Sequence, residues 1–311
     1  MISGSERLGP LISGETPGLE GELGANINGA CPIKAPSWLA ERLGRYYLYF
    51  AHHNGDHIRL AYADDVQGPW RIYSPGVLHL AESEARGHLA SPDVRIDEAT
   101  RSLELLYHGP LQQGQVRLYP YESQATYLAR SYDGINFTPT GKGPIAPPYL
   151  RHFDWKGTTY GLCMALDPAL GGGRSGLLLR RTIHGAFEPG PRIIPAMRHA
   201  AVAVRNGLLE VFFTAVGDVP EHIKYVTVSL AEDWVDWTAT GESSLLTPVA
   251  AWEGGDLPIT GSSPGASKDR EHALRDPGYL RDGANEYLFY SGAGERNIGC
   301  VRLVRDELAD A

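Results

Sequence analysis

The sequence is poor in cysteine, in basic residues and in long apolar runs. Its three cysteines, Cys31, Cys163 and Cys300, are far apart and form no CxxC pair. This pattern argues against a disulfide framework or a zinc site and favours three buried thiols. No stretch reaches the roughly 18 apolar residues of a membrane span. Residues 1–15 show no basic start followed by an apolar run. We therefore expect no signal peptide, no membrane partner and a cytoplasmic location.

Basic residues are outnumbered, with 28 Lys and Arg against 37 Asp and Glu and a formal charge of -9. A dispersed acidic excess argues against nucleic acid as a main partner, because nucleic acids need a basic surface. Long helical periodicity is also scarce. The 37 glycines and 22 prolines of the 311 residues instead favour many short strands joined by turns.

Short strand-like segments recur in a fixed order. Five runs are rich in aromatic and aliphatic residues, as buried strands are: YYLYFA (46–51), LELLYH (103–108), TYGLCMA (159–165), LLEVFFTA (208–215) and EYLFYSG (286–292). Each has a candidate strand before it and another after it. In four cases an aromatic-bearing segment then follows: GPWRIY (68–73), GINFTP (134–139), GAFEPG (185–190) and VDWTAT (235–240). The repeating unit is therefore four strands long.

Five four-stranded units predict an all-β fold, a five-bladed β-propeller with antiparallel strands. We expect a single domain over residues 1–311, with blades at approximately 26–75, 88–140, 144–190, 196–240 and 245–305. The fifth unit lacks an obvious last strand, and residues near 8–20 are the candidate that would close the ring. A two-sheet sandwich is the alternative, but it does not explain the repeated aromatic turn.

Propeller geometry predicts where a site lies. In each blade, the start of the innermost strand and the loop between the second and third strands lie on the same face of the ring. Polar residues at these two positions therefore converge on a central funnel. The innermost-strand candidates are Asn28, Asp93, Arg151, His199 and Asp276. The loop candidates include His53, His108, Asp218, Glu221 and Glu295. Each residue alone resembles an ordinary surface residue, and their concentration at equivalent places is what indicates a site.

Several of these residues have two interpretations. Asp93, in Ser-Pro-Asp-Val, is either a rigid, partly desolvated carboxylate suited to acid–base chemistry or the cap of a turn. Asp276 repeats the arrangement beside Arg275, which either binds a ligand or forms an ion pair. His199, next to Arg198, is either a site residue or a core histidine. Glu221 is either a funnel carboxylate or a solvated turn residue, and Trp252 either stacks on a sugar or packs a loop.

Metal and phosphate motifs are weak. His52, His53 and His57 do not form an HExxH pattern, and the glycines at 171–173 precede Arg174 without the Lys-Ser/Thr of a phosphate loop. We therefore predict no metal site and no cofactor, and leave open a structural metal ion in the central channel.

Longer segments point to a family. The stretches GRYYLYFAHH (44–53), IRLAYADDVQGPW (58–70), HLASPDVRI (88–96), LRDPGYL (274–280) and EYLFYSGAGE (286–295) resemble the five-bladed propeller glycoside hydrolases, relatives of families 43, 32 and 117. The resemblance covers about residues 26–305 and looks closest to an uncharacterised branch of that group.

The resemblance implies a funnel that binds the non-reducing end of a glycan and three acids that cleave it. Asp93 falls at the position of the second-blade acid. Asn26 and Asn28 stand where the first-blade Asp is expected, and the third blade has Tyr149, Arg151 and His152 in place of its Glu. The sequence thus departs from the usual triad at two of three places. A minority of relatives use histidine as the acid, and His199 is a candidate for that role.

We therefore predict a glycoside hydrolase that acts on a terminal sugar. Asp93 and Asp276 are the predicted carboxylates, and His199 or Glu221 is the predicted proton donor. Arg151, Arg198 and Arg275 favour an anionic or otherwise modified sugar. Further predicted substrate contacts are Asn28, His53, His108, Asp218, Trp252 and Glu295. The alternatives are a non-catalytic carbohydrate-binding propeller and a lyase or phosphorylase on the same scaffold. The sequence indicates no oligomeric state.

Overall fold

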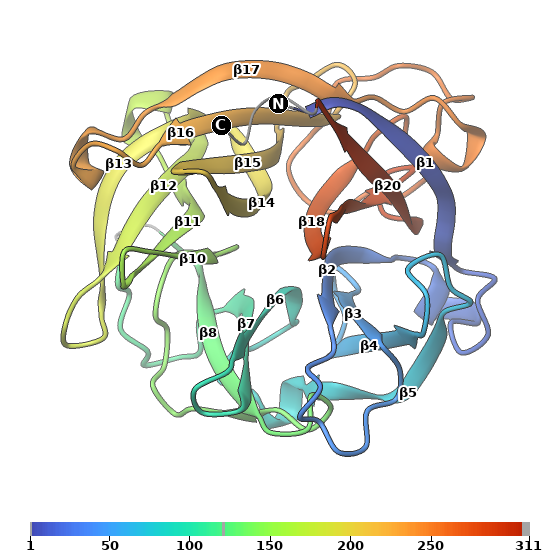
Figure 1. The fold of residues 1–311 in the computed structure, drawn as a ribbon, viewed down its shortest axis with the longest axis horizontal. Helices are drawn as coiled ribbons and strands as arrows, with labels where there is room; N and C mark the ends of the chain where they lie inside the picture. The colour runs from blue at the N-terminus through green and yellow to red at the C-terminus, as the bar shows by residue number, and fades with distance from the viewer. Residues whose placement is uncertain (1, 120–121, 307–311) are drawn as a thin grey trace.

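The computed structural model describes residues 2–119 and 122–306, which form five four-stranded antiparallel sheets arranged as blades around a ring (Figure 1). The predicted all-β five-bladed propeller is confirmed. The first strand of each blade, β2, β6, β10, β14 or β18, lies nearest the centre of the ring in Figure 1. The described residues form no α-helix, only five short 3-10 turns, and none of their helices could cross a membrane.

The strands follow the chain from the centre of each blade outward. The first blade contains β2 (Asn28–Lys34), β3 (Tyr46–Ala51), β4 (His57–Ala63) and β5 (Arg71–His79). The second contains β6 (Ala90–Asp97), β7 (Ser102–Pro110), β8 (Gln124–Ser131) and β9 (Thr138–Pro139). The third contains β10 (Arg151–Trp155), β11 (Thr158–Leu166), β12 (Arg174–Arg181) and β13 (Phe187–Pro195). The fourth contains β14 (Met197–Arg205), β15 (Leu208–Ala215), β16 (Ile223–Ser229) and β17 (Ala239–Leu246).

The fifth blade joins the two ends of the chain. It contains β18 (Arg275–Asp282), β19 (Asn285–Gly292), β20 (Asn297–Arg305) and, on its outer edge, the N-terminal strand β1 (Ile2–Ser13). This strand begins earlier than the segment near 8–20 that the sequence suggested, because β1 pairs with the whole of β20 from Ile2 to Ser13. Pairing of β1 with β20 closes the ring without a covalent bond.

The aromatic residues of the repeated turn mostly lie just before the outer strands rather than within them. Trp70, Phe137 and Trp237 precede β5, β9 and β17 and are 7%, 5% and 2% exposed. Each packs into a core cluster between two neighbouring blades. These large rings fill the space between neighbouring blades. The repeated aromatic residue in the sequence therefore indicates the turn that leads into the outermost strand.

A bulge interrupts the start of the innermost strand in four of the five blades. In three of them the bulge contains a residue with a left-handed backbone, namely Gly29 (φ 71°), Ser91 (φ 45°) and Asp276 (φ 49°). The fourth bulge lies between Met197 and Ala200. A bulge bends the strand and redirects its side chains. Left-handed backbone at a non-glycine residue such as Asp276 is frequent at functional sites.

Candidate active site

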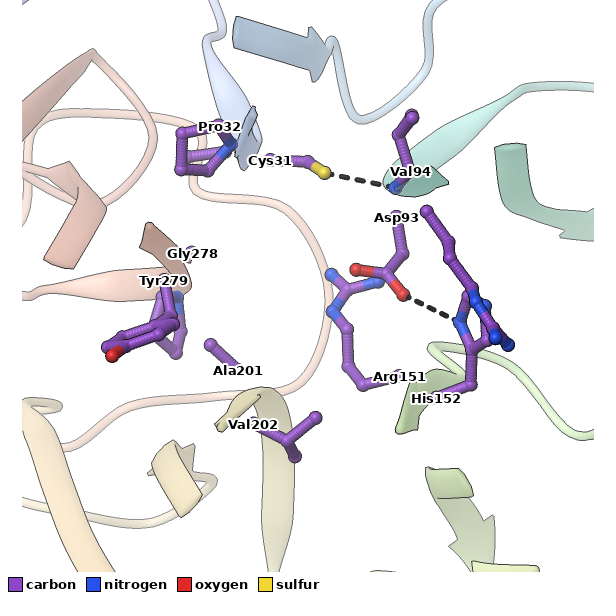
Figure 2. Close-up of a pocket in the computed structure, with 13 residues that line it drawn as sticks. Cys31, Pro32, Asp93, Val94, Arg151, His152, Ala201, Val202, Gly278 and Tyr279 are labelled. Atoms are coloured by element: carbon purple, nitrogen blue, oxygen red, sulfur yellow. Dashed lines mark hydrogen bonds and ion pairs between the residues drawn. The ribbon is translucent and has the colours of Figure 1, made fainter. Parts of the chain in front are cut away.

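Two cavities lie along the axis of the ring. The funnel, of about 640 Å³, is lined mostly by the third and fourth blades, including Tyr149, Arg174, Arg198 and His199, with His53 from the first blade. The channel, of about 210 Å³, lies further along the same strands and is lined by Asp93, Arg151, His152, Ala201 and Tyr279 among others (Figure 2). The order of these residues along β10 and β14 places the funnel before the channel.

Arg151 lies at the junction of the two cavities. Its Nε donates to the carbonyl oxygen of Ala200 at 2.9 Å, and its Nη1 donates to that of Ser91 at 3.3 Å. The side chain is buried, and in Figure 2 it extends toward Asp93 in the middle of the channel. These bonds connect the second, third and fourth blades. Arg151 is therefore held as a structural cross-link at the base of the funnel.

Asp93 lines the channel and pairs with His152, whose Nδ1 lies 3.2 Å from Oδ2 of Asp93 (Figure 2). Burial alone would raise the pKa of Asp93. The hydrogen bond with His152 and the charge of Arg151 outweigh that effect and bring the pKa below its ordinary value. Asp93 is therefore an ionised carboxylate. The structure does not bring it together with His199 in the funnel.

His199 and Asp276 form a pair at the floor of the funnel. Nδ1 of His199 lies 2.9 Å from Oδ1 of Asp276, and Asp276 also accepts a hydrogen bond from Ser291 at 3.4 Å. Burial would raise the pKa of Asp276, but the charge of His199 holds it below its usual value. His199 itself lines the funnel, whereas Asp276 is buried behind it. The contact is an ion-pair distance without hydrogen-bond geometry. With Nδ1 facing the carboxylate, Nε2 is the ring nitrogen left for a ligand.

Arg275 is the centre of a buried ionic cluster behind this pair. It is 1% exposed and contacts three carboxylates: Nε lies 2.9 Å from Glu221, Nη1 lies 3.2 Å from Glu295 and Nη2 lies 2.6 Å from Glu271. Glu221 also accepts a hydrogen bond from Arg198 at 3.1 Å. Burial raises the pKa of Glu221, although both arginines oppose that shift. Arg275 and Glu221 thus support the floor of the funnel.

Glu295 connects this cluster to the first blade. Its Oε2 accepts hydrogen bonds from Asn26 at 2.6 Å and from Asn28 at 3.2 Å, and it lies 3.6 Å from Nδ1 of His53. Burial would raise the pKa of Glu295, but His53, Asn26 and Arg275 together hold it well below its ordinary value. Asn26 and Asn28 are therefore amide donors to an ionised glutamate.

A row of rings runs around one side of the funnel. The ring centroids of His53 and His88 are 6.2 Å apart, those of His88 and His108 are 6.1 Å apart, and those of His108 and Tyr149 are 4.0 Å apart. Tyr149 then lies 4.7 Å from His199. His108 is 1% exposed, and burial holds its pKa well below the ordinary value. It is therefore a neutral packing partner of Tyr149 behind the funnel surface.

Two predicted substrate contacts lie elsewhere. Trp252 stacks on Tyr290 at 6.0 Å and packs against Gly292 and Gly299 of the fifth blade, so it is a packing residue rather than a surface for a sugar. Asp218 lies in the loop between β15 and β16, where its carboxylate is 3.2 Å from Nζ of Lys224 in β16. It does not line the funnel.

Sequence reasoning missed Arg174, Gln124 and His88. Arg174 and Gln124 line the funnel at the starts of β12 and β8, the third strands of their blades. The prediction considered only the loop between the second and third strands of each blade. Including the first residue of the third strand would have found both residues. Arg174 is held by Glu122, which accepts from its Nη1 at 2.8 and 3.0 Å.

No group of three or more His, Cys, Asp or Glu residues suited to a metal ion occurs within residues 2–119 and 122–306. In the channel, the buried guanidinium of Arg151 lies near the carboxylate of Asp93. A fixed positive charge on the axis opposes the binding of a cation there.

Comparisons place the chain among known proteins. No protein-family model matches it. It is 30% identical over 316 residues to "Uncharacterized protein R118" of Acanthamoeba polyphaga mimivirus, covering 89% of this chain and 83% of the mimivirus protein. A thermostable family-43 glycoside hydrolase has a TM-score of 0.64 at 12% identity, covering 91% of each chain. The GH43_1 enzyme from Xanthomonas citri complexed with xylotriose has a TM-score of 0.58 at 12% identity, covering 97% of this chain and 91% of its own. At these identities, the likeness shows that the fold is shared.

Proposed function

This chain belongs to the same family as the mimivirus protein and has the fold of family 43 glycoside hydrolases, and we propose that it cleaves the glycosidic bond of a terminal sugar in the funnel. The observation that carries the proposal is the His199–Asp276 pair at the floor of a 640 Å³ cavity. A cavity of this size suits a small ligand, and a buried carboxylate that orients an imidazole is a common acid–base device.

His199 is the proton donor in this proposal. Its Nε2 gives a proton to the leaving oxygen as the bond between that oxygen and the anomeric carbon breaks, and Asp276 fixes the ring from behind. The resemblance to propeller glycoside hydrolases puts Tyr149, Arg151 and His152 where a third-blade glutamate is expected, and Tyr149 packs on His199 at 4.7 Å. Asp276 contacts the donor but is buried behind it, so hydrolysis by this route needs a water held between the sugar and Asp276.

The proposed substrate carries a negative charge. Arg174 and Arg198 line the funnel, whereas no Asp or Glu does so among the described residues around it. The carboxylates that pair with these arginines, Glu122 and Glu221, are buried behind them. Arg174 is the more accessible of the two, with a side chain 29% exposed, whereas Arg198 is 4% exposed and also donates to the carbonyl oxygen of Ser263. A carboxylate, sulfate or phosphate group on the sugar would be attracted to these arginines.

The absence of a carboxylate from the described funnel lining supports a second candidate, phosphorolysis. In this reaction, an oxygen of inorganic phosphate attacks the anomeric carbon, the bond to the leaving oxygen breaks, and His199 protonates that oxygen. The products are a sugar 1-phosphate and the freed alcohol. Inorganic phosphate is then the nucleophile, so the protein needs only a proton donor for the leaving oxygen and cationic groups that bind the phosphate.

A screen of neutral and anionic glycosides, each with and without inorganic phosphate, tests both candidates. Release of free sugar without phosphate supports hydrolysis, and sugar 1-phosphate formed only with phosphate supports phosphorolysis. His199→Gln should reduce either activity by about 10²–10⁴-fold on glycosides with poor leaving groups. His184→Gln is the matched control, because His184 is exposed in the turn between β12 and β13. Binding of glycans without turnover by the wild type would instead support the non-catalytic alternative.

A further inference from the structure

One wall of the funnel is apolar. Side chains from the third and fourth blades and from the loop before β18 form it: Met164, Leu166, Leu170, Ala196, Val216 and Pro264. The polar residues His53, Gln124, Arg174, Arg198 and His199 line the remainder of the same cavity. The funnel lining therefore combines hydrogen-bonding and aliphatic side chains, and Leu166 of the aliphatic set pairs across the strands with Arg174.

The apolar wall is open to the cavity instead of being covered by other protein groups. Leu170 is 44% exposed, and Leu166, Ala196 and Val216 are partly exposed. Exposed aliphatic side chains inside a ligand-sized cavity mark a binding surface for apolar atoms. Such a surface does not match sugar hydroxyls, each of which loses hydrogen bonds to water when it is buried without a partner.

The wall also lacks the flat rings that usually stack on sugars. Trp252 packs within the fifth blade, and the ring of Tyr149 lies between those of His108 and His199. Tyr149 is the only Phe, Trp or Tyr among the described residues that line the funnel. An extended oligosaccharide would thus meet aliphatic side chains beyond the terminal sugar.

We propose that this wall binds an apolar aglycone, so that the substrate is an alkyl or aryl glycoside rather than a longer glycan. The inference rests on the proposed function for its chemistry. Ala196 lies three residues before His199, in the turn just before β14, and its carbonyl accepts a hydrogen bond from the backbone N–H of Val216 at 3.0 Å. An oxygen protonated by His199 would therefore have its departing group beside Ala196 and Val216.

The size of the cavity agrees with a two-part ligand. A volume of 640 Å³ corresponds to about twenty water molecules at roughly 30 Å³ each. A pyranose ring with its hydroxyls has about twelve non-hydrogen atoms, so a terminal sugar leaves room for an attached group of comparable size.

The first experiment needs no knowledge of the sugar. The probe is 8-anilinonaphthalene-1-sulfonate, which joins an apolar ring system to an anion and becomes fluorescent in apolar surroundings. Wild-type protein should bind it, and Leu166→Asn and Val216→Thr should each weaken binding more than threefold. Ile183→Thr is the matched control, because Ile183 is 97% exposed at the other end of β12 and should leave binding unchanged. Absence of binding to the wild type, or equal binding by all variants, overturns the inference.

The second experiment compares n-octyl and methyl glycosides of the same sugars, including glucuronides. The leaving alcohols, octanol and methanol, have similar basicity, so the two compounds differ mainly in the length of the alkyl chain. Each buried methylene strengthens binding about fourfold, so burial of three gives about 60-fold tighter binding of the octyl compound. Leu166→Asn should reduce that ratio without changing the affinity for the methyl glycoside. Cleavage of both compounds with equal affinity overturns the inference and leaves the proposed function standing. Tighter octyl binding without cleavage supports the wall and refutes the proposed function.

Discussion

Substitution of Arg275 by methionine tests whether the ionic cluster supports the floor of the funnel. Methionine is similar in length but removes a charge that contacts Glu221, Glu271 and Glu295 at 2.6–3.2 Å. Removing one partner from a buried ionic group costs about 3–5 kcal/mol, because the remaining charge stays buried without compensation. A chain of 311 residues has an unfolding entropy of roughly 0.65 kcal/mol/K. We therefore expect the Tm to fall by roughly 5–8 °C.

The loss of stability should depend on pH in a defined direction. The pKa of Glu295 lies below its ordinary value in the folded protein, so this carboxylate contributes stability above its unfolded pKa of about 4.3, and that contribution is lost as pH falls through the folded pKa. Arg275→Met weakens this contribution. The pKa of Glu221 is already raised by burial, so Glu221 takes up a proton as pH falls and relieves the uncompensated charge. The difference between wild type and variant should therefore be largest near pH 7 and shrink toward pH 4.

Urea unfolding at pH 7 and pH 4.5 measures both effects. The double variant Arg275→Met/Glu221→Gln should recover part of the lost stability, because it also removes one of the unpaired charges. Arg305→Met is the control: Arg305 binds Glu210 and Glu286, but its side chain is 13% exposed, so a smaller loss is expected. Equal stability of Arg275→Met and wild type at pH 7, or a loss independent of pH, would refute the argument.

Three further predictions concern the reaction and the closure of the ring. His199→Gln should slow glycosides with poor leaving groups by about 10²–10⁴-fold and activated aryl glycosides much less, and equal losses would exclude it as the proton donor. Asp276→Asn should lower kcat on the same substrates, whereas Asp93→Asn, which changes the channel, should keep near wild-type kcat; the reverse result would move the chemistry to Asp93. Deletion of residues 2–13 should expose the edge of β20 and cause aggregation detectable by light scattering, and a soluble monomer with wild-type unfolding would contradict this expectation.

The sequence predicted the propeller because each blade repeats the same local chemistry. Runs such as YYLYFA and LLEVFFTA become the fully buried strands β3 and β15, with all but the first residue of β15 buried. The outer strands were less predictable. Trp70 and Trp237 were expected inside them, but packing between blades holds these rings in the preceding turns. That packing involves residues of the neighbouring blade, and local sequence carries no information about it.

The site was predictable in position but not in detail. Among the candidates at strand starts and loops, His53 and His199 line the funnel, as does Arg198, the neighbour of His199. The rule for strand starts and loops could not separate surface residues from buried ones, because the partners of Arg275 are 4 to 54 residues away in sequence. The bulges also mattered. Asp93 lies on the far side of the bulge that contains Ser91, and this irregularity carries its side chain into the channel.

The charges around His199 are arranged in two layers with opposite effects. Behind it, Glu221, Glu271, Glu295 and Asp276 provide four carboxylates against the two guanidiniums of Arg198 and Arg275. In front of it, Arg174 and Arg198 line the funnel without an acidic neighbour among the described lining residues. The buried carboxylates offset the positive charge of the arginines among them, and the open layer attracts an anionic ligand to the same floor. An anionic ligand drawn to these arginines would bring its leaving oxygen to His199, the proposed proton donor.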